Sequence, residues 1–291
     1  MNPPLLTPEF VRELETLRSF LRARARSGGA GGTTARRHGR GAEFEQHRPY
    51  AAGDDVGRLD WLAFARTGQP VSKEHRADED TIVRLVVDGS ASSAFGSPRK
   101  LDMAARVAAG LSYLSLSDGN RVEVVAASGA SARAMPIHRG RPSLGVVLKE
   151  LSAIVPSGEV RIASALSHAV AASERPGALV ALSDFLDDGP VVDTLRRARH
   201  AGHDVTLVHV LSREETSPEL GGDVALVDSE TGETVDVTLD AEMLAAYQRR
   251  LGALCEDLES FARHSGALYV RATTDEQPAA VIRRVIARGA A

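Results

Sequence analysis

Two short polar clusters in this sequence contain the residue types that bind a divalent cation. The first, Asp88-Gly89-Ser90-Ala91-Ser92, directly follows the apolar run Ile82–Val87, and Asp184 ends a second apolar run, Ala178–Ser183. Carboxylate and hydroxyl oxygens are the hard ligands that Mg²⁺ or Mn²⁺ prefers, and such sites usually keep waters and an open position. The candidate metal ligands are therefore Asp88, Ser90, Ser92 and Asp184.

The place of these residues in the chain favours a binding site. In an open α/β sheet, ligands gather outside the carboxyl ends of the strands, where a carboxylate and two hydroxyls from one strand end can meet a carboxylate from another. Ser and Asp are also ordinary turn and N-cap residues, so a purely structural role for the same residues is the alternative.

The elements that must position these residues follow from the hydrophobic pattern. Beyond Asp80, short β-branched runs alternate with helical stretches, which predicts an α/β fold with a mostly parallel sheet. We expect strands at 82–88, 121–126, 132–137, 178–183, 205–211 and 267–270. We expect helices at 100–116, 143–154, 162–173, 190–201, 241–264 and 275–287. The run after Ser128-Gly129 indicates a hairpin and hence one antiparallel edge strand.

The flanking segments divide the chain into three predicted parts. Residues 1–38 hold an amphipathic helix, capped by Thr7 and begun by Pro8, and then a basic Gly-rich linker. Residues 39–80 form a signature segment that we expect to pack on the sheet. Residues 81–291 form the α/β domain, into which a β-hairpin is inserted at about 221–239.

The composition excludes several classes of protein. The 35 basic and 39 acidic side chains among 291 residues leave a net charge of -4, so no global field attracts nucleic acid. A single cysteine, Cys255, cannot form an intramolecular disulfide or a Cys-based zinc site, and its neighbours predict an inert core thiol. No apolar run approaches about 18 residues. We therefore expect a cytoplasmic protein without a signal peptide or membrane span.

Most common catalytic motifs are absent from the sequence. There is no P-loop, because none of the three lysines follows a glycine, so a partner would have to supply any ATP hydrolysis. There is also no Gly-x-Ser-x-Gly nucleophile elbow. His200 and His203 are spaced to share a metal, but they flank Gly202 at a predicted helix end, which imidazoles favour.

An acidic cluster upstream offers an enzymatic alternative. Its carboxylates could bind metals for phosphoryl or glycosyl chemistry; they are Glu43, Asp54, Asp55 and Asp60. The preferred interpretation is structural, with these carboxylates paired to Arg48, Arg58 and Arg66. The aromatic residues of the segment would then pack together on the sheet; they are Phe44, Tyr50, Trp61 and Phe64.

The motifs together resemble a known family. Asp88-x-Ser90-x-Ser92, at the end of a first strand and before a helix from Lys100, resembles the metal-ion-dependent adhesion site of von Willebrand factor A domains. Further motifs resemble one branch, the MoxR-associated family of bacterial proteins, historically a domain family of unknown function. These motifs are Gly41-Ala42-Glu43-Phe44, Arg48-Pro49-Tyr50, Gly53-Asp54-Asp55, Leu59-Asp60-Trp61 and Asp228-x-Glu230-Thr231-Gly232-Glu233. The resemblance implies a Rossmann-like sheet flanked by helices.

The resemblance also implies a function. Genes of this family typically lie beside those of MoxR-type AAA+ ATPases, which implies a non-enzymatic module that binds a partner protein through Mg²⁺ or Mn²⁺. It would work with such an ATPase in chaperone-like assembly or regulation of a client protein. A metal-dependent hydrolase and a scaffold whose metal site has decayed are the alternatives.

One loop departs from the family pattern. The third element of such a metal site is normally a threonine, whereas the corresponding loop, residues 156–161, has Val160. Valine offers no oxygen, which leaves Ser157 or Glu159 as the candidate substitutes. If neither substitutes, water would take the place of the hydroxyl and the affinity for Mg²⁺ would be lower.

Overall fold

The computed structural model describes residues 4–26, 43–49, 63, 67, 69, 71–76, 81–129, 131–158, 161–186, 189–219, 221–229 and 232–289. The chain divides into two units, one formed by residues 1–29 together with 81–291 and the other by residues 30–80. In the second unit, β1 (Glu43–Pro49) and β2 (Val71–Arg76) pair antiparallel. The expected packing of residues 39–80 on the sheet stays a prediction.

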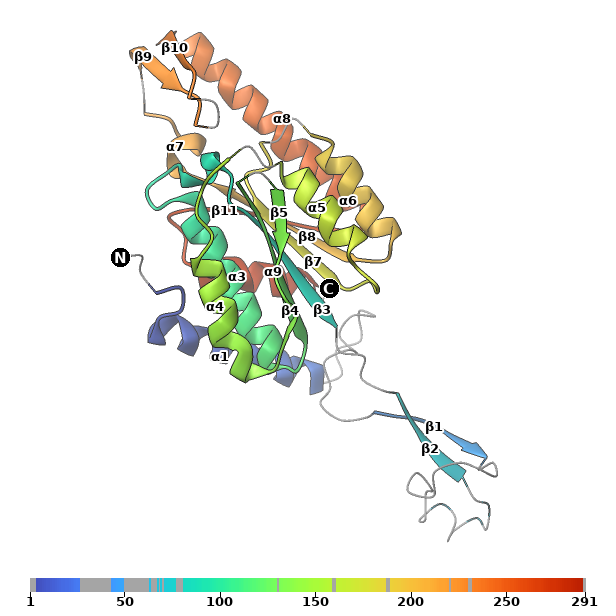
Figure 1. The fold of residues 1–291 in the computed structure, drawn as a ribbon. Helices are drawn as coiled ribbons and strands as arrows, with labels where there is room; N and C mark the ends of the chain where they lie inside the picture. Colours follow the sequence, from blue (N-terminus) through green and yellow to red (C-terminus); the bar gives the residue numbers. More distant parts are fainter. Residues whose placement is uncertain are drawn as a thin grey trace. The chain divides into compact units, whose positions relative to one another are not determined.

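The larger unit is built on a seven-stranded sheet (Figure 1). Its central strands pair in the order β11-β8-β7-β3-β4-β5, and β6 also pairs with β4. The strands are β3 (Ile82–Asp88), β4 (Arg121–Ser128), β5 (Ser131–Ala134), β6 (His138–Arg139), β7 (Ala178–Ser183), β8 (Asp204–Leu211) and β11 (Leu268–Thr273). All pairs are parallel except those of β4 with β5 and β6. The predicted α/β class is confirmed, including the antiparallel strand at β5.

Helices cover both faces of this sheet, and a separate hydrophobic core lies under each layer (Figure 1). The first layer contains α1 (Pro8–Arg26), α3 (Lys100–Ser117), α4 (Leu144–Ser152) and α9 (Pro278–Gly289). The second contains α5 (Ile162–Ala171), α6 (Val191–His200) and α8 (Ala241–Ser265). Because both faces are covered, central strands such as β3 are buried at nearly every position instead of alternating.

The N-terminal helix α1 is part of the first layer. Thr7 caps it by accepting a hydrogen bond from the Phe10 backbone N–H at 3.2 Å. Phe10 and Leu14 are buried in the core beneath it, and α1 contacts α3 and α9. Arg18 fixes the contact by an ion pair of 2.9 Å with Asp118 at the end of α3. Arg22 pairs with the same carboxylate at 2.7 Å, so an apolar stripe and several charged contacts hold this helix on the domain.

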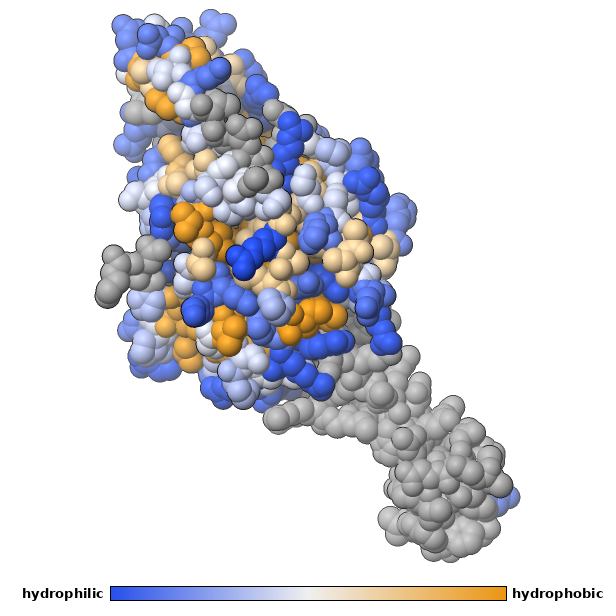
Figure 2. Space-filling model, in the orientation of Figure 1, coloured by the Kyte–Doolittle hydropathy of each residue, from blue (hydrophilic) through white to orange (hydrophobic). Residues whose placement is uncertain are grey.

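A hairpin extends from the domain beside the long helix α8. Its strands β9 (Gly222–Val227) and β10 (Thr234–Leu239) pair only with each other, after the short helix α7 (Arg213–Thr216). Leu226 and Val235 stay exposed, and Figure 2 shows hydrophobic side chains among strongly hydrophilic ones at this end of the domain. No helix in the described part of the chain is long and apolar enough to cross a membrane.

Candidate metal centre

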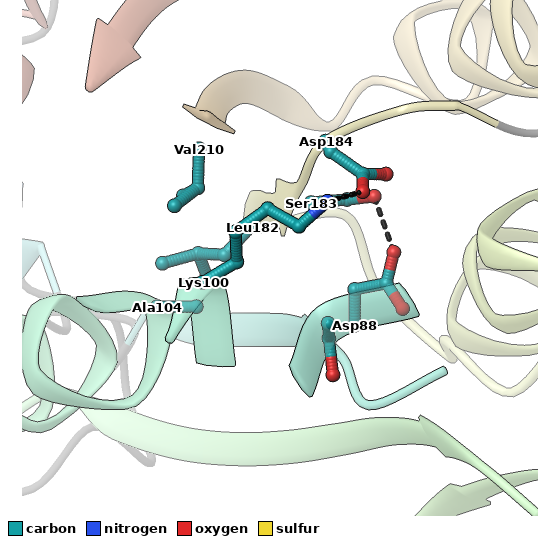
Figure 3. A pocket seen from close by; sticks show the side chains of 8 residues that line it. Asp88, Lys100, Ala104, Leu182, Ser183, Asp184 and Val210 are labelled. Carbon is teal, nitrogen blue, oxygen red and sulfur yellow. Dashed lines mark hydrogen bonds and ion pairs between the residues drawn. The ribbon is translucent and has the colours of Figure 1, made fainter. Parts of the chain in front are cut away.

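The two predicted carboxylates come together at the carboxyl ends of adjacent strands. Asp88 ends β3 and Asp184 follows β7, which pairs with β3. Both residues are buried and line one small cavity, shown in Figure 3. The cavity is also lined by Ser93, Lys100, Ala104, Leu182, Ser183 and Val210. The strand-end argument from the sequence therefore locates this pair of carboxylates correctly.

The two predicted serines lie beside the cavity and not in its lining. The Ser90 backbone N–H donates to Asp88 Oδ1 at 2.9 Å, which folds the loop back on the strand end. A short 3₁₀ helix, η3 (Ala91–Ala94), follows. The hydroxyls of Ser90 and Ser92 are 2.9 Å apart and hydrogen-bonded to each other. The structure thus joins Asp88, Ser90 and Ser92 in one loop, with Asp184 across the cavity.

A second loop packs against the first through backbone hydrogen bonds. The Ser157 N–H donates to Gly89 O at 2.9 Å, and the Ala91 N–H donates to Gly158 O at 3.2 Å. A Cβ at Gly158 would lie 2.0 Å from the Gly129 carbonyl oxygen, so only glycine allows this approach.

This second loop is the one in which the family pattern has a threonine. The Ser157 hydroxyl hydrogen-bonds to Ser128 Oγ at 3.2 Å and to Val155 O at 3.3 Å. Glu159 and Val160 lie outside the described residues. The role of Val160 therefore stays a prediction.

Ser183, which directly precedes Asp184, binds the carboxylate of Asp88 and was not among the predicted residues. Its hydroxyl donates to Asp88 Oδ2 at 2.5 Å and accepts from the Phe185 N–H at 2.9 Å. Phe185, directly after Asp184, has a φ of 53°, in the left-handed region that a bulky side chain rarely adopts. Its ring is buried against His209. This strained turn and the Ser183 hydroxyl together fix the end of β7.

The largest departure from the sequence-based prediction is a lysine at the centre of the site. Lys100, the first residue of α3, places its Nζ 2.5 Å from Asp184 Oδ2 (Figure 3). The same Nζ lies 2.6 Å from Glu215 Oε1. Glu215 is held by a capping box, because its Oε2 accepts from the Ser212 N–H at 2.7 Å while its own N–H donates to Ser212 Oγ.

Burial and the close approach of charged groups shift the pKa values of two residues in the site. Burial raises the pKa of Asp88, and the charge of Asp184 raises it further, while hydrogen bonds from Ser183 and Ser90 act in the opposite direction. Burial alone would lower the pKa of Lys100, but Asp184 and Glu215 outweigh it and the pKa is raised. Lys100 is therefore a permanent cation, whereas the charge on Asp88 is poorly compensated by the chain.

The donor set fits a hard divalent cation. Asp88 and Asp184 line the cavity, and Glu215 contacts it through Lys100, so the three carboxylates, when ionised, exceed the one ammonium by two negative charges. They do not form a three-carboxylate metal cluster among the described residues, so the serine hydroxyls and water would have to complete the ligand set. The separation of 2.9 Å between the hydroxyls of Ser90 and Ser92 also suits adjacent ligands of an octahedral ion bound at about 2.1 Å. Every donor is an oxygen, as Mg²⁺ or Mn²⁺ prefers.

Two of the unpredicted residues had signals in the sequence. Lys100 is one of only three lysines among 35 basic residues, so its type is unusual for this chain. Ser212-x-x-Glu215 matches the capping-box pattern. Ser183 had no such signal, since a serine at the end of a strand is ordinary.

The remaining residues that the sequence singled out lie away from this cavity or outside the described residues. His203 is buried, and its Nδ1 accepts a hydrogen bond from the Gly177 N–H. No cluster of three or more His, Cys, Asp or Glu residues that could hold a metal occurs in the described ranges. Cys255 lies in α8 as a free, half-buried thiol, with its Sγ 4.0 Å from His209 Nδ1. The side chains of the acidic cluster and its aromatic neighbours lie outside the described residues; they are Glu43, Asp54, Asp55, Asp60, Phe44, Tyr50, Trp61 and Phe64.

Comparison with known proteins gives relatives of unknown function. The uncharacterized protein Rv1480 of Mycobacterium tuberculosis is 34% identical over 257 residues, which cover 86% of this chain and 80% of that protein. The uncharacterized protein MAV169 of Mycobacterium avium is 32% identical over 160 residues, which cover 52% of this chain and 91% of that protein.

Solved structures and a family model complete the comparison. The conserved hypothetical protein BatB from Bacteroides thetaiotaomicron is similar with a TM-score of 0.48 and 17% identity, covering 72% of this chain and all of that one. The model of the family described as "Protein of unknown function DUF58" matches residues 46–253. Because this match spans most of the chain, the protein belongs to the DUF58 family.

Proposed function

We propose that this protein is a non-enzymatic module that binds a partner protein through a divalent cation and works in the cytoplasm with a MoxR-type AAA+ ATPase on a client protein. The observation that carries the proposal is the excess of two negative charges among Asp88, Asp184, Glu215 and Lys100, together with two hydroxyls 2.9 Å apart in the Asp88 loop. A single Mg²⁺ or Mn²⁺ ion would neutralise that excess.

The chain's residues would share the work of holding the ion. Asp88, Ser90 and Ser92 lie in one loop and would ligate it directly or through water. Asp184, already bound to Lys100, would contribute its charge through water. The bound ion would supply a positive centre with an open position for a carboxylate of the partner.

The surroundings of the site suit a protein ligand. Phe95 after η3, Val155 in the loop that packs on Gly89, and Leu186 after Asp184 are 50%, 64% and 56% exposed. Exposed hydrophobic side chains beside a few polar groups are typical of protein-binding surfaces. The resemblance described above supports a MoxR-type AAA+ ATPase as the partner. Such a partner would hydrolyse ATP, which this chain cannot do through a P-loop because its sequence has none.

Metal binding is tested first by thermal unfolding. Mg²⁺ at one hundred times its dissociation constant should stabilise the protein by about 2.7 kcal/mol, and Asp88→Ala should abolish the shift in melting temperature. Asp193→Ala, at an exposed position of α6, is the control and should respond like the wild type. An unchanged melting curve of the wild type in millimolar Mg²⁺ would favour the decayed scaffold.

Partner binding is tested with a purified MoxR-type AAA+ ATPase from the same organism, immobilised for surface plasmon resonance. We expect binding in Mg²⁺ that is lost in chelator and lost in Asp88→Ala. Equal binding in Mg²⁺ and chelator would show that the interface does not use the cation. Turnover of model phosphoesters by the purified protein would instead support the hydrolase alternative.

A further inference from the structure

The ammonium group of Lys100 occupies one side of the candidate metal centre. Its side chain is only 5% exposed, and its Nζ lies between Asp184 Oδ2 and Glu215 Oε1 at 2.5 Å and 2.6 Å. Ala104, Leu182 and Val210 line the same cavity, so apolar groups surround the charge (Figure 3). Lys100 is therefore held where a cation bound to Asp184 would otherwise lie.

Helix stability does not explain a lysine at this position. Lys100 begins α3, an 18-residue helix, and a cation at a helix N-terminus opposes the helix dipole. Burying the ammonium also costs the free energy of removing it from water. The two carboxylates offset these costs, with a smaller contribution from the Phe95 ring, whose centroid lies 5.8 Å from Nζ. The contacts of Lys100 with Asp184 and Glu215 therefore account for most of its stabilisation at this position.

These contacts leave Asp184 with both oxygens in use. Its Oδ1 accepts from the Leu186 N–H at 3.1 Å, and its Oδ2 binds Lys100. Within the described ranges, Asp88 has hydrogen bonds from Ser90 and from the Ser183 hydroxyl but no ion pair. The two carboxylates of the site are thus unequal, because one is paired with a cation of the chain and the other is not.

We propose that Lys100 is a built-in counter-ion that competes with the external cation for Asp184 and so weakens metal binding. Lys100 keeps Asp184 from ligating the metal directly, which leaves the ion to Asp88, Ser90 and Ser92. Glu215 moderates the competition, because it shares the ammonium and is itself fixed by Ser212. The proposal rests on the proposed metal site and makes Lys100 a positioning residue for it.

The test is the dissociation constant of Mg²⁺, measured by isothermal titration calorimetry on the full chain. Lys100→Met should bind Mg²⁺ at least tenfold more tightly than the wild type, because Asp184 is freed and the cavity gains negative charge. Glu215→Gln should bind it more weakly, because the ammonium then pairs with Asp184 alone, while Gln can preserve the capping box. Lys149→Met, at an exposed position of α4, is the control and should not differ from the wild type.

The double variant Lys100→Met/Glu215→Gln separates competition for Asp184 from simple net charge. It removes one positive and one negative charge, so the net charge of the cavity equals that of the wild type. Lys100→Met leaves two carboxylates without their cationic partner, whereas the double variant leaves only Asp184 without one. The double variant can therefore still be measured if Lys100→Met alone does not fold. Competition predicts tighter Mg²⁺ binding than in the wild type, and equal binding would overturn the proposal.

The remaining outcomes distinguish this inference from the proposed function. If the wild type binds Mg²⁺ and Lys100→Met binds it equally or more weakly, the counter-ion role is wrong and the metal site stands. If the wild type does not bind Mg²⁺ but Lys100→Met does, Lys100 fills the site in the natural protein, and the cation-dependent function is wrong. If no variant binds Mg²⁺, both are wrong.

Discussion

The two ends of the central strand β3 both bury charges, but they balance them differently. Near its start, Arg84 pairs with Glu123 of β4 at 2.8 Å, with side chains 2% and 11% exposed. At its carboxyl end, Asp88 joins Asp184, Glu215 and a single lysine. The charges at the first end cancel, whereas the second has an excess of two negative charges when its carboxylates are ionised.

The difference separates a structural ion pair from a candidate binding site. A buried pair of opposite charges needs nothing from outside, and the Arg84 guanidinium also donates to the Arg175 carbonyl oxygen at 3.4 Å. Buried carboxylates without enough counter-charge carry a desolvation cost until a proton or a cation neutralises them. Burial of charge alone therefore identifies no site, and charge balance is the more informative property.

The largest effect is expected at the balanced end. Arg84→Met leaves Glu123 buried without a partner and should lower the free energy of unfolding by about 3–5 kcal/mol in urea denaturation. The double variant Arg84→Met/Glu123→Leu should recover most of that loss, because two apolar side chains then replace the pair. Both variants should keep the wild-type melting shift in Mg²⁺. A changed metal response would show that the two ends of β3 are coupled.

A second, smaller effect concerns a buried histidine beside the candidate site. Burial lowers the pKa of His209 to about 4, although Asp184 opposes the shift. Between pH 6.5 and 4 the unfolded chain binds a proton that the folded chain does not. Stability should therefore be lost as the pH falls through this window, by about 3 kcal/mol for His209.

The comparison of variants isolates this histidine from other acid-sensitive groups. His209→Gln should show a shallower loss of unfolding free energy between pH 6.5 and 4, measured by urea denaturation at each pH. His203, at the opposite end of the sheet layer, also has a pKa lowered by burial and by Arg84, so it supplies part of the remaining slope. A wild-type slope in His209→Gln would mean that His209 takes up a proton when folded.

The sequence predicted the elements well because their signals are local. The expected strand 82–88 and helix from residue 100 match β3 and α3, whose apolar pattern is set by neighbours within a few residues. The short elements η3 and α7 were missed, since a single turn has too few residues to show a period. The carboxylates Asp88 and Asp184 were found because both end clear apolar strands.

The contacts that complete the site could not be predicted in this way. Lys100 lies 84 residues before Asp184 and 115 before Glu215, so no local pattern connects them. Their meeting depends on where α3 and α7 begin relative to the end of β7, which only the packed fold determines. A lysine in an arginine-rich chain was a signal of unusual type, but it did not identify the partners.

The smallest predicted effect tests the excess negative charge at the carboxyl end of β3 through its own carboxylate, Asp88. Burial and the charge of Asp184 raise the pKa of Asp88, so the folded state binds a proton there more tightly than the unfolded chain. Without metal, the contribution of Asp88 to the free energy of unfolding should be greatest below the unfolded carboxyl pKa and should be lost as the pH rises through the raised value. Asp88→Asn removes the charge and should stabilise the metal-free protein at pH 7, on the order of 1 kcal/mol.

Mg²⁺ should reverse the order of the two proteins. The asparagine can still accept from the Ser90 N–H and reach the Ser183 hydroxyl, so its fold should persist, but it offers a cation no charge. In chelator, Asp88→Asn should therefore melt above the wild type; in saturating Mg²⁺ the wild type should melt higher, because only it gains binding energy. A lower melting temperature for Asp88→Asn in chelator would mean that hydrogen bonds to the charged carboxylate outweigh its burial. The chain itself would then compensate the charge at the carboxyl end of β3 without a metal, as it does at the Arg84 end.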